Sequence, residues 1–192
     1  MTATIALFGA FSIIFTIFSN LVFKLGFIPP VSYLLFDLGE IPPILCFLII
    51  GPRAGVAVAV IEWLSLNLFP TTAPLIGPLF KLLSVIPTIV GLWIGWKLLP
   101  RPNSTLKSRL AVGSVAAAVL RAIVMTVPNA LYLIFGFGLN PSQSIFYYIL
   151  ELTAVFNFLQ IPFDVVPSYI IIQLPQVKRL LRNNRMTWFE TT

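Results

Sequence analysis

The chain of 192 residues contains no histidine and only one cysteine, Cys46. Without histidine it lacks the commonest general base, the commonest metal ligand and the usual partner of a serine or cysteine nucleophile. It also has no GxxxxGK[ST] phosphate loop, and a lone cysteine cannot form a disulfide within one chain. We therefore predict no catalytic residue, no metal site and no cofactor, and any ATP hydrolysis linked to this chain would have to occur in another subunit.

Charged residues are also scarce, at 9%, whereas 58% of the residues are hydrophobic and the mean hydropathy is +0.99. Soluble domains carry about a quarter charged residues. Several uncharged runs approach the roughly 20 residues that cross a bilayer as a helix. The run 4–23 has no preceding basic segment and no clear cleavage site, which indicates a retained span rather than a signal peptide. The sequence predicts an all-α, polytopic membrane protein.

Six apolar runs are separated by short segments rich in proline, glycine, asparagine or charge. They predict six transmembrane helices in one bundle, forming a single domain over residues 1–192, with spans at about 4–25, 38–51, 54–69, 78–99, 110–136 and 160–181. The alternative is five spans, with residues 41–69 as one helix broken at Gly51-Pro52-Arg53-Ala54-Gly55. A hairpin at that point is favoured, because it keeps Arg53 out of the bilayer centre. Residues 142–158 are an additional outer or re-entrant helix in this scheme.

The basic residues give the bundle an orientation, since Lys and Arg accumulate in short cytoplasmic loops. Six spans with a cytoplasmic N-terminus place nearly all of them inside, in three groups: Arg53; Lys97, Arg101, Lys107 and Arg109; and Lys178, Arg179, Arg182 and Arg185. Only Lys24 is clearly outside. We expect both termini in the cytoplasm and the protein in the plasma membrane. The net charge of +6 is explained by topology and anionic lipids, so no nucleic-acid partner is expected.

Polar residues within a membrane domain are candidates for function, because burying them is costly. In the six-span scheme one set shares an outer depth and predicts a small-molecule pocket: Asp37, Glu40, Lys81, Asn129, Tyr132 and Asp164. The alternative for each is a snorkelling side chain or a helix cap, with Asp37 as an N-cap. Glu62 and Arg121 share a deeper level, where a buried ion pair is expected to offset the cost of the two charges.

Small residues recur at a spacing of four in three spans, as Ala6 and Ala10, Gly91 and Gly95, and Gly113 and Ala117. Such pairs let helix backbones approach closely within lipid. They serve either packing within the chain or contact with a partner subunit.

The segment FDLGEIPPILCFLIIGPRAGVAVAVIEWLSLNLF resembles the second and third helices of S components of energy-coupling factor (ECF) transporters. Further similar motifs are ALFGA near the N-terminus, VMTVPNALYL in the fifth span and IPFDVVPSYIII in the sixth. The resemblance implies six helices, a vitamin pocket near the outer surface capped by the loop after the first helix, and docking on a transmembrane coupling subunit driven by two ATPases. It also implies that Ala6 and Ala10 face the coupling subunit and that Asn129 contacts the ligand.

Within that family the motifs are most similar to the riboflavin-binding type, with two departures. Asp164 stands where those members have asparagine, and Pro167 stands where they have lysine. Riboflavin is thus the first ligand to consider, beside another vitamin or a related precursor. Two other functions are compatible with the sequence: a structural scaffold similar to the rod-shape protein of cell-wall synthesis, and an autonomous ion-coupled permease that uses Glu62 and Arg121.

Overall fold

A computed structural model describes residues 1–23, 31, 34–68, 75–99, 104–183 and 188, and nearly all of these are helical. The predicted all-α class is confirmed. Lys24, Arg101 and Arg185 and most of the loop after the first helix lie outside the described residues. The elements are α1 (Thr2–Phe18), a π-helical turn η1 (Ser19–Phe23), a 3-10 turn η2 (Leu38–Glu40), α2 (Ile41–Ile50), α3 (Pro52–Leu66), α4 (Ile76–Leu98), α5 (Leu106–Phe135), α6 (Ser144–Gln173) and α7 (Pro175–Asn183).

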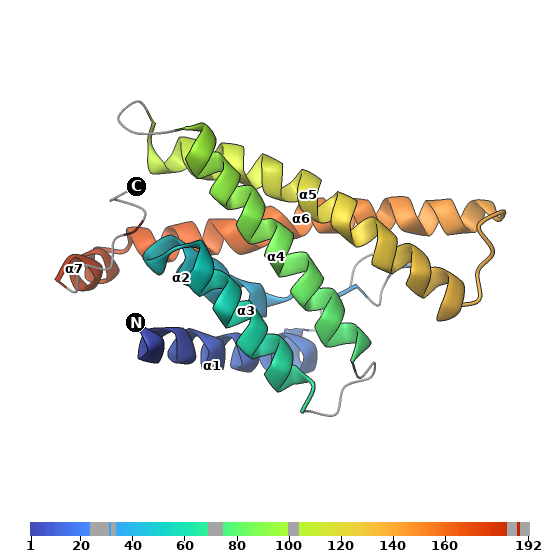
Figure 1. Ribbon diagram of the computed structural model, residues 1–192, viewed down its shortest axis with the longest axis horizontal. Helices are drawn as coiled ribbons and strands as arrows, with labels where there is room; N and C mark the ends of the chain where they lie inside the picture. Colours follow the sequence, from blue (N-terminus) through green and yellow to red (C-terminus); the bar gives the residue numbers. More distant parts are fainter. Residues whose placement is uncertain (24–30, 32–33, 69–74, 100–103, 184–187, 189–192) are drawn as a thin grey trace.

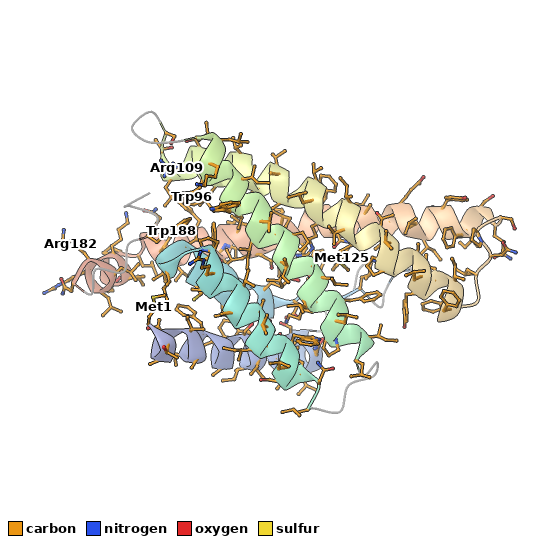
Figure 2. The ribbon with its side chains drawn as sticks, in the orientation of Figure 1. Met1, Trp96, Arg109, Met125, Arg182 and Trp188 are labelled. Atoms are coloured by element: carbon orange, nitrogen blue, oxygen red, sulfur yellow. The ribbon has the colours of Figure 1, made fainter. Side chains whose placement is uncertain are left out.

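The helices form one elongated bundle (Figure 1). Both termini lie at one end, which we call the terminal end, and the connection between α5 and α6 lies at the other, which we call the hairpin end. Helix α7 is seen end-on in this view, so it runs across the direction of the long helices. Figure 2 places the labelled side chains of Met1, Trp96, Arg109, Arg182 and Trp188 together at the terminal end.

Four helical segments are long and apolar enough to cross a membrane: Thr2–Leu21, Ile76–Leu98, Leu106–Phe135 and Ser144–Gln173. The protein is therefore a membrane protein with several apolar helices. Helices α2 and α3 have 10 and 15 residues, which corresponds to about 15 and 22 Å, and both are shorter than the roughly 30 Å of a hydrocarbon core. The count of six spans stays a prediction.

The turn between α2 and α3 has the form that the sequence favoured. Gly51 adopts a φ of 122°, which a residue with a side chain rarely accepts, and the chain folds back there so that α2 and α3 pack on each other. Arg53 is exposed in the first turn of α3. The alternative, residues 41–69 as one helix broken at Gly51-Pro52-Arg53-Ala54-Gly55, is not found, because α2 and α3 pack against each other rather than end to end.

Helix α6 corrects the predicted last span. It begins at Ser144 rather than at about residue 160, and it continues through Pro162 and Pro167 to Gln173. The segment 142–158 is thus mostly the first half of a single 30-residue helix, and residues 175–183 form the separate helix α7. A membrane helix tolerates such prolines where neighbouring helices satisfy the freed backbone groups.

Two glycines on α4 explain the close packing of α4 on α5. A Cβ atom on Gly91 would lie 2.2 Å from the Cα of Ala117, and one on Gly95 would lie 2.5 Å from the Cα of Gly113. The backbones of α4 and α5 are in direct contact at both positions, so neither position has room for a side chain. These four small residues therefore serve packing within the chain, whereas Ala6 and Ala10 are exposed on α1.

The core centres on α2, whose residues 41–49 are all buried. A helix that is apolar all round belongs inside a bundle rather than at its surface. At the terminal end, Phe47 of α2 packs edge-on against Trp96 and Trp188, and the two tryptophan rings stack with centroids 5.5 Å apart (Figure 2). The short central helix α2 consequently brings the residues before it, 37–40, into the interior of the molecule.

Candidate functional site

Buried polar side chains along α1 and the start of η1 bind residues 37–40, which we call the inner segment. Ser12 and Thr16 of α1 and Ser19, the first residue of η1, recur at positions i, i+4 and i+7 and are buried. The Ser12 hydroxyl donates to the carbonyl of Gly39 at 2.6 Å, and the Ser19 hydroxyl accepts from the amide of Leu38 at 3.0 Å. These bonds satisfy backbone groups of the inner segment that would otherwise be unpaired within the bundle.

Lys81 of α4 joins the inner segment to α3. Its Nζ lies 2.5 Å from Oδ2 of Asp37 and 2.5 Å from Oε1 of Glu62, and it also hydrogen-bonds to the hydroxyl of Thr16. The Thr16 hydroxyl in turn donates to Glu62 at 2.6 Å. A Cβ atom on Gly39 would meet both the Thr16 oxygen and the Lys81 amine, so a larger residue there would displace these groups. Asp37 also caps η2 by accepting from the Gly39 amide, as predicted for an N-cap.

Arg121 of α5 anchors the other side of the inner segment. Its two terminal nitrogens bind Glu40 in a fork, at 2.5 Å to Oε2 and 3.0 Å to Oε1. Its Nε donates to Oδ1 of Asn157 at 2.9 Å, and Nη1 lies 3.7 Å from Oδ2 of Asp164. The bidentate arrangement is the strongest geometry for a guanidinium and a carboxylate.

These side chains form what we call the central network: Thr16, Asp37, Glu40, Glu62, Lys81, Arg121, Asn157, Gln160 and Asp164. It gathers four of the six acidic residues of the chain around two cations. Isolated charges there would be very costly, and their mutual pairing offsets much of that cost. The predicted pair of Glu62 with Arg121 is wrong, because the inner segment lies between them and gives each its own partner, Lys81 for Glu62 and Glu40 for Arg121.

Among the described residues, four buried side-chain oxygens have no hydrogen-bond partner. Three of them lie on α5 and α6, namely Oε1 of Gln160, Oδ2 of Asp164 and Oδ1 of Asn129, and the fourth is Oδ1 of Asn67 at the end of α3. Gln160 uses both of its amide hydrogens, donating to Oδ1 of Asp164 at 2.7 Å and to the carbonyl of Asp37 at 3.2 Å. Buried acceptors without donors are uncommon in proteins because they retain a desolvation penalty. They are suited to a bound molecule that presents N–H or O–H groups.

The six predicted pocket residues divide into two groups. Asp37, Glu40, Lys81 and Asp164 meet in the central network. Asn129 lies eight residues beyond Arg121 on α5, a rise of about 12 Å towards the hairpin end, and its amide donates to the carbonyl of Met125 at 2.6 Å. Tyr132 lies still further along and packs against Phe80 and Phe137. The expected approach of Asn129 to Asp164 is not found, because Asp164 lies within the continuous helix α6 rather than at its start.

Sequence reasoning missed Thr16, Asn157 and Gln160. A signal for them was present as a polar stripe on α6, formed by Thr153, Asn157, Gln160, Asp164 and Ser168, all of which are buried. The stripe was not recognised because the helix was expected to begin near residue 160, which separated its members. Within the described part of the chain, no three His, Cys, Asp or Glu side chains are grouped so that they could hold a metal ion.

The family model for the substrate-specific component of ECF transporters matches residues 1–172. The S component of a bacterial ECF transporter, of known structure, has a similar fold, with a TM-score of 0.69, 22% sequence identity and coverage of 95% of both chains. No curated protein matches the chain. S components bind the substrate of a transporter that also contains a coupling subunit and ATPases, and they are not enzymes. Because the family model covers most of its length, the chain belongs to the substrate-specific components of ECF transporters.

Proposed function

We propose that the protein captures a vitamin or a related small precursor near the outer face of the plasma membrane and delivers it by docking on a coupling subunit that carries two ATPases. ATP is hydrolysed by those subunits, and this chain needs no cofactor. The observation that carries the proposal is the family match over residues 1–172. The oxygens of Gln160 and Asn129 that have no hydrogen-bond partner support a polar ligand on the faces of α5 and α6 that point into the bundle.

The orientation is part of the proposal. The described basic residues that are exposed near the terminal end are Arg53, Lys97, Lys107, Lys178, Arg179 and Arg182. Their concentration at one end is typical of the cytoplasmic side. The termini are then cytoplasmic, and a ligand enters from the hairpin end.

The kind of ligand can be inferred from the buried hydrogen-bond acceptors that have no partner. The oxygens of Gln160 and Asn129 that have no partner can only accept hydrogen bonds, so the ligand should present donors. Riboflavin carries hydroxyl and N–H groups and is the first compound to test. Restoring the residue of the riboflavin binders by Asp164→Asn should preserve or improve its affinity, measured by quenching of flavin fluorescence.

Ligand capture is tested by mass spectrometry of small molecules that co-purify with the detergent-solubilised protein, followed by titration with the compound found. Gln160→Ala removes a buried acceptor and should weaken binding by about tenfold or more, since each 1.4 kcal/mol is a factor of ten. Gln173→Ala, on the same helix near the terminal end, is the matched control and should bind normally. Equal affinities of these two variants would rule out a ligand at Gln160.

Docking is tested on α1, where Ala6 and Ala10 are exposed while Gly9 packs against Ile61 inside the molecule. Leucine at both alanine positions should block a close approach of a partner helix and abolish uptake, while the isolated subunit still binds its ligand. Val115→Leu, on the exposed face of α5, adds apolar bulk elsewhere and should transport normally. Loss of folding in the double variant would show that the pair packs internally.

Neither alternative function is favoured. A structural scaffold is not a member of this family, and it would leave the unpaired acceptors without a role. An autonomous permease was expected to use a pair of Glu62 and Arg121, which the structure does not contain.

A further inference from the structure

A groove of about 200 Å³ runs between the first part of α5 and the last part of α6, and none of its lining residues belongs to the central network. It is lined by Lys107, Leu110, Ala111 and Ser114 of α5 and by Val165, Val166 and Tyr169 of α6. The α5 residues are spaced i, i+3, i+4 and i+7, so they form one face of the helix. The groove therefore follows the helix axis, over a rise of about 10 Å from Lys107 to Ser114.

The groove exists because two of the side chains that line it on α5 are small. Ala111 and Ser114 leave space on α5, while Val166 is exposed and Val165 and Tyr169 form the opposite wall on α6. Both helices are long and apolar enough to cross the bilayer, and the groove is open to the surroundings. An apolar groove that runs along two membrane helices has the shape and surface that an extended acyl chain requires.

Lys107 places a positive charge at one end of the groove. It is the second residue of α5, it is exposed, and α5 begins at the terminal end of the bundle. A helix of 30 residues is about 45 Å long and exceeds the roughly 30 Å hydrocarbon core, so we expect its first turn at the level of the lipid headgroups. The start of a helix also carries a partial positive charge that favours an anion. None of the residues that line the groove is acidic. The positive charge at the end of the groove suits the phosphate of an anionic phospholipid, and the apolar groove between the helices suits its acyl chain.

We propose that this groove binds one anionic phospholipid, with an acyl chain against Ala111 and Ser114 and the phosphate at Lys107. The site is separate from the substrate acceptors and from the exposed alanines of α1, so it does not depend on the proposed function. A substrate pocket would be expected to enclose its ligand, whereas this groove opens towards the bilayer.

The test is native mass spectrometry of the full chain in mild detergent, incubated with equal amounts of phosphatidylglycerol and phosphatidylcholine of the same acyl chains. The wild type should retain one phosphatidylglycerol in preference to phosphatidylcholine. Ser114→Leu fills the groove and should remove binding of both lipids, whereas Val115→Leu, on the neighbouring exposed surface, should not. Lys107→Gln should reduce the preference for phosphatidylglycerol about fivefold, while Lys97→Gln, an exposed lysine on α4, should leave it unchanged.

Each variant is first checked by size-exclusion elution and helical circular dichroism, and Ala111→Leu serves as a second filling variant if Ser114→Leu fails to fold. The proposal is overturned if the filled variants retain phosphatidylglycerol like the wild type. It is also overturned if the two lysine variants lose the preference equally, because that result indicates a diffuse basic surface. If the wild type retains no lipid but Ser114→Leu prevents co-purification of the coupling subunit, the groove is a protein interface and the lipid proposal is wrong.

Discussion

Replacing Arg121 should be among the most damaging single changes in the protein. The guanidinium is almost fully buried, binds Glu40 in a fork and lies within ion-pair distance of Asp164. Methionine preserves much of the volume of arginine but leaves two buried carboxyl groups without their cation. Removing one partner of a buried ion pair typically costs about 3–5 kcal/mol, and we expect Arg121→Met to reduce the free energy of unfolding by that amount.

A second substitution, at Glu40, separates the contribution of the Arg121–Glu40 ion pair to the free energy of unfolding. Glu40→Gln in the Arg121→Met background removes one of the stranded charges, so the double variant should lose about 2 kcal/mol less than the sum of the two single losses. The free energies are measured by unfolding in mixed micelles of a mild detergent and sodium dodecyl sulfate, followed by tryptophan fluorescence. Arg53→Met is the matched control, because Arg53 is exposed and its loss should change stability by no more than about 0.5 kcal/mol.

Two outcomes would refute this reasoning. A loss no larger for Arg121→Met than for Arg53→Met would mean that Arg121 is not buried among carboxyl groups in the folded protein. Additive losses in the double variant would mean that Arg121 and Glu40 do not interact energetically, whatever their separation.

Two further predictions concern topology and packing. Cysteine at Ser104 should resist an impermeant thiol reagent in intact cells, whereas cysteine at Ser142 should react, because the terminal end is expected to be cytoplasmic. The reverse labelling would invert the orientation and the proposed side of ligand entry. Gly91→Ala should lower the free energy of unfolding by about 1–3 kcal/mol, because its Cβ would meet the backbone of Ala117. Gly77→Ala on the same helix has open space around it and should be neutral or stabilising. Equal effects of the two substitutions would show that α4 and α5 are not in close contact.

Much of the architecture could be predicted from the sequence because hydropathy and helix breaking act locally. The scarcity of charge and the apolar runs predicted a helical membrane protein, and the proline and glycines after Ile50 predicted the turn between α2 and α3. The resemblance of several motifs predicted the family that the comparison then confirmed over residues 1–172. Each of these conclusions depends on neighbouring residues in the chain, so no knowledge of helix packing was needed.

The pairing of the buried charges was decided only by the tertiary structure. The sequence shows that Glu62, Lys81 and Arg121 lie inside apolar segments, but it does not show which helices are neighbours. In the folded chain a short α2 carries the inner segment into the centre, where Glu40 reaches Arg121 and Asp37 reaches Lys81. The ion pairs form between helices far apart in sequence, since electrostatic energy depends on distance in space and on burial. The same reason separates Asn129 from Asp164: their depths follow from where α6 begins and how it packs on α5, and hydropathy along the chain does not contain that information.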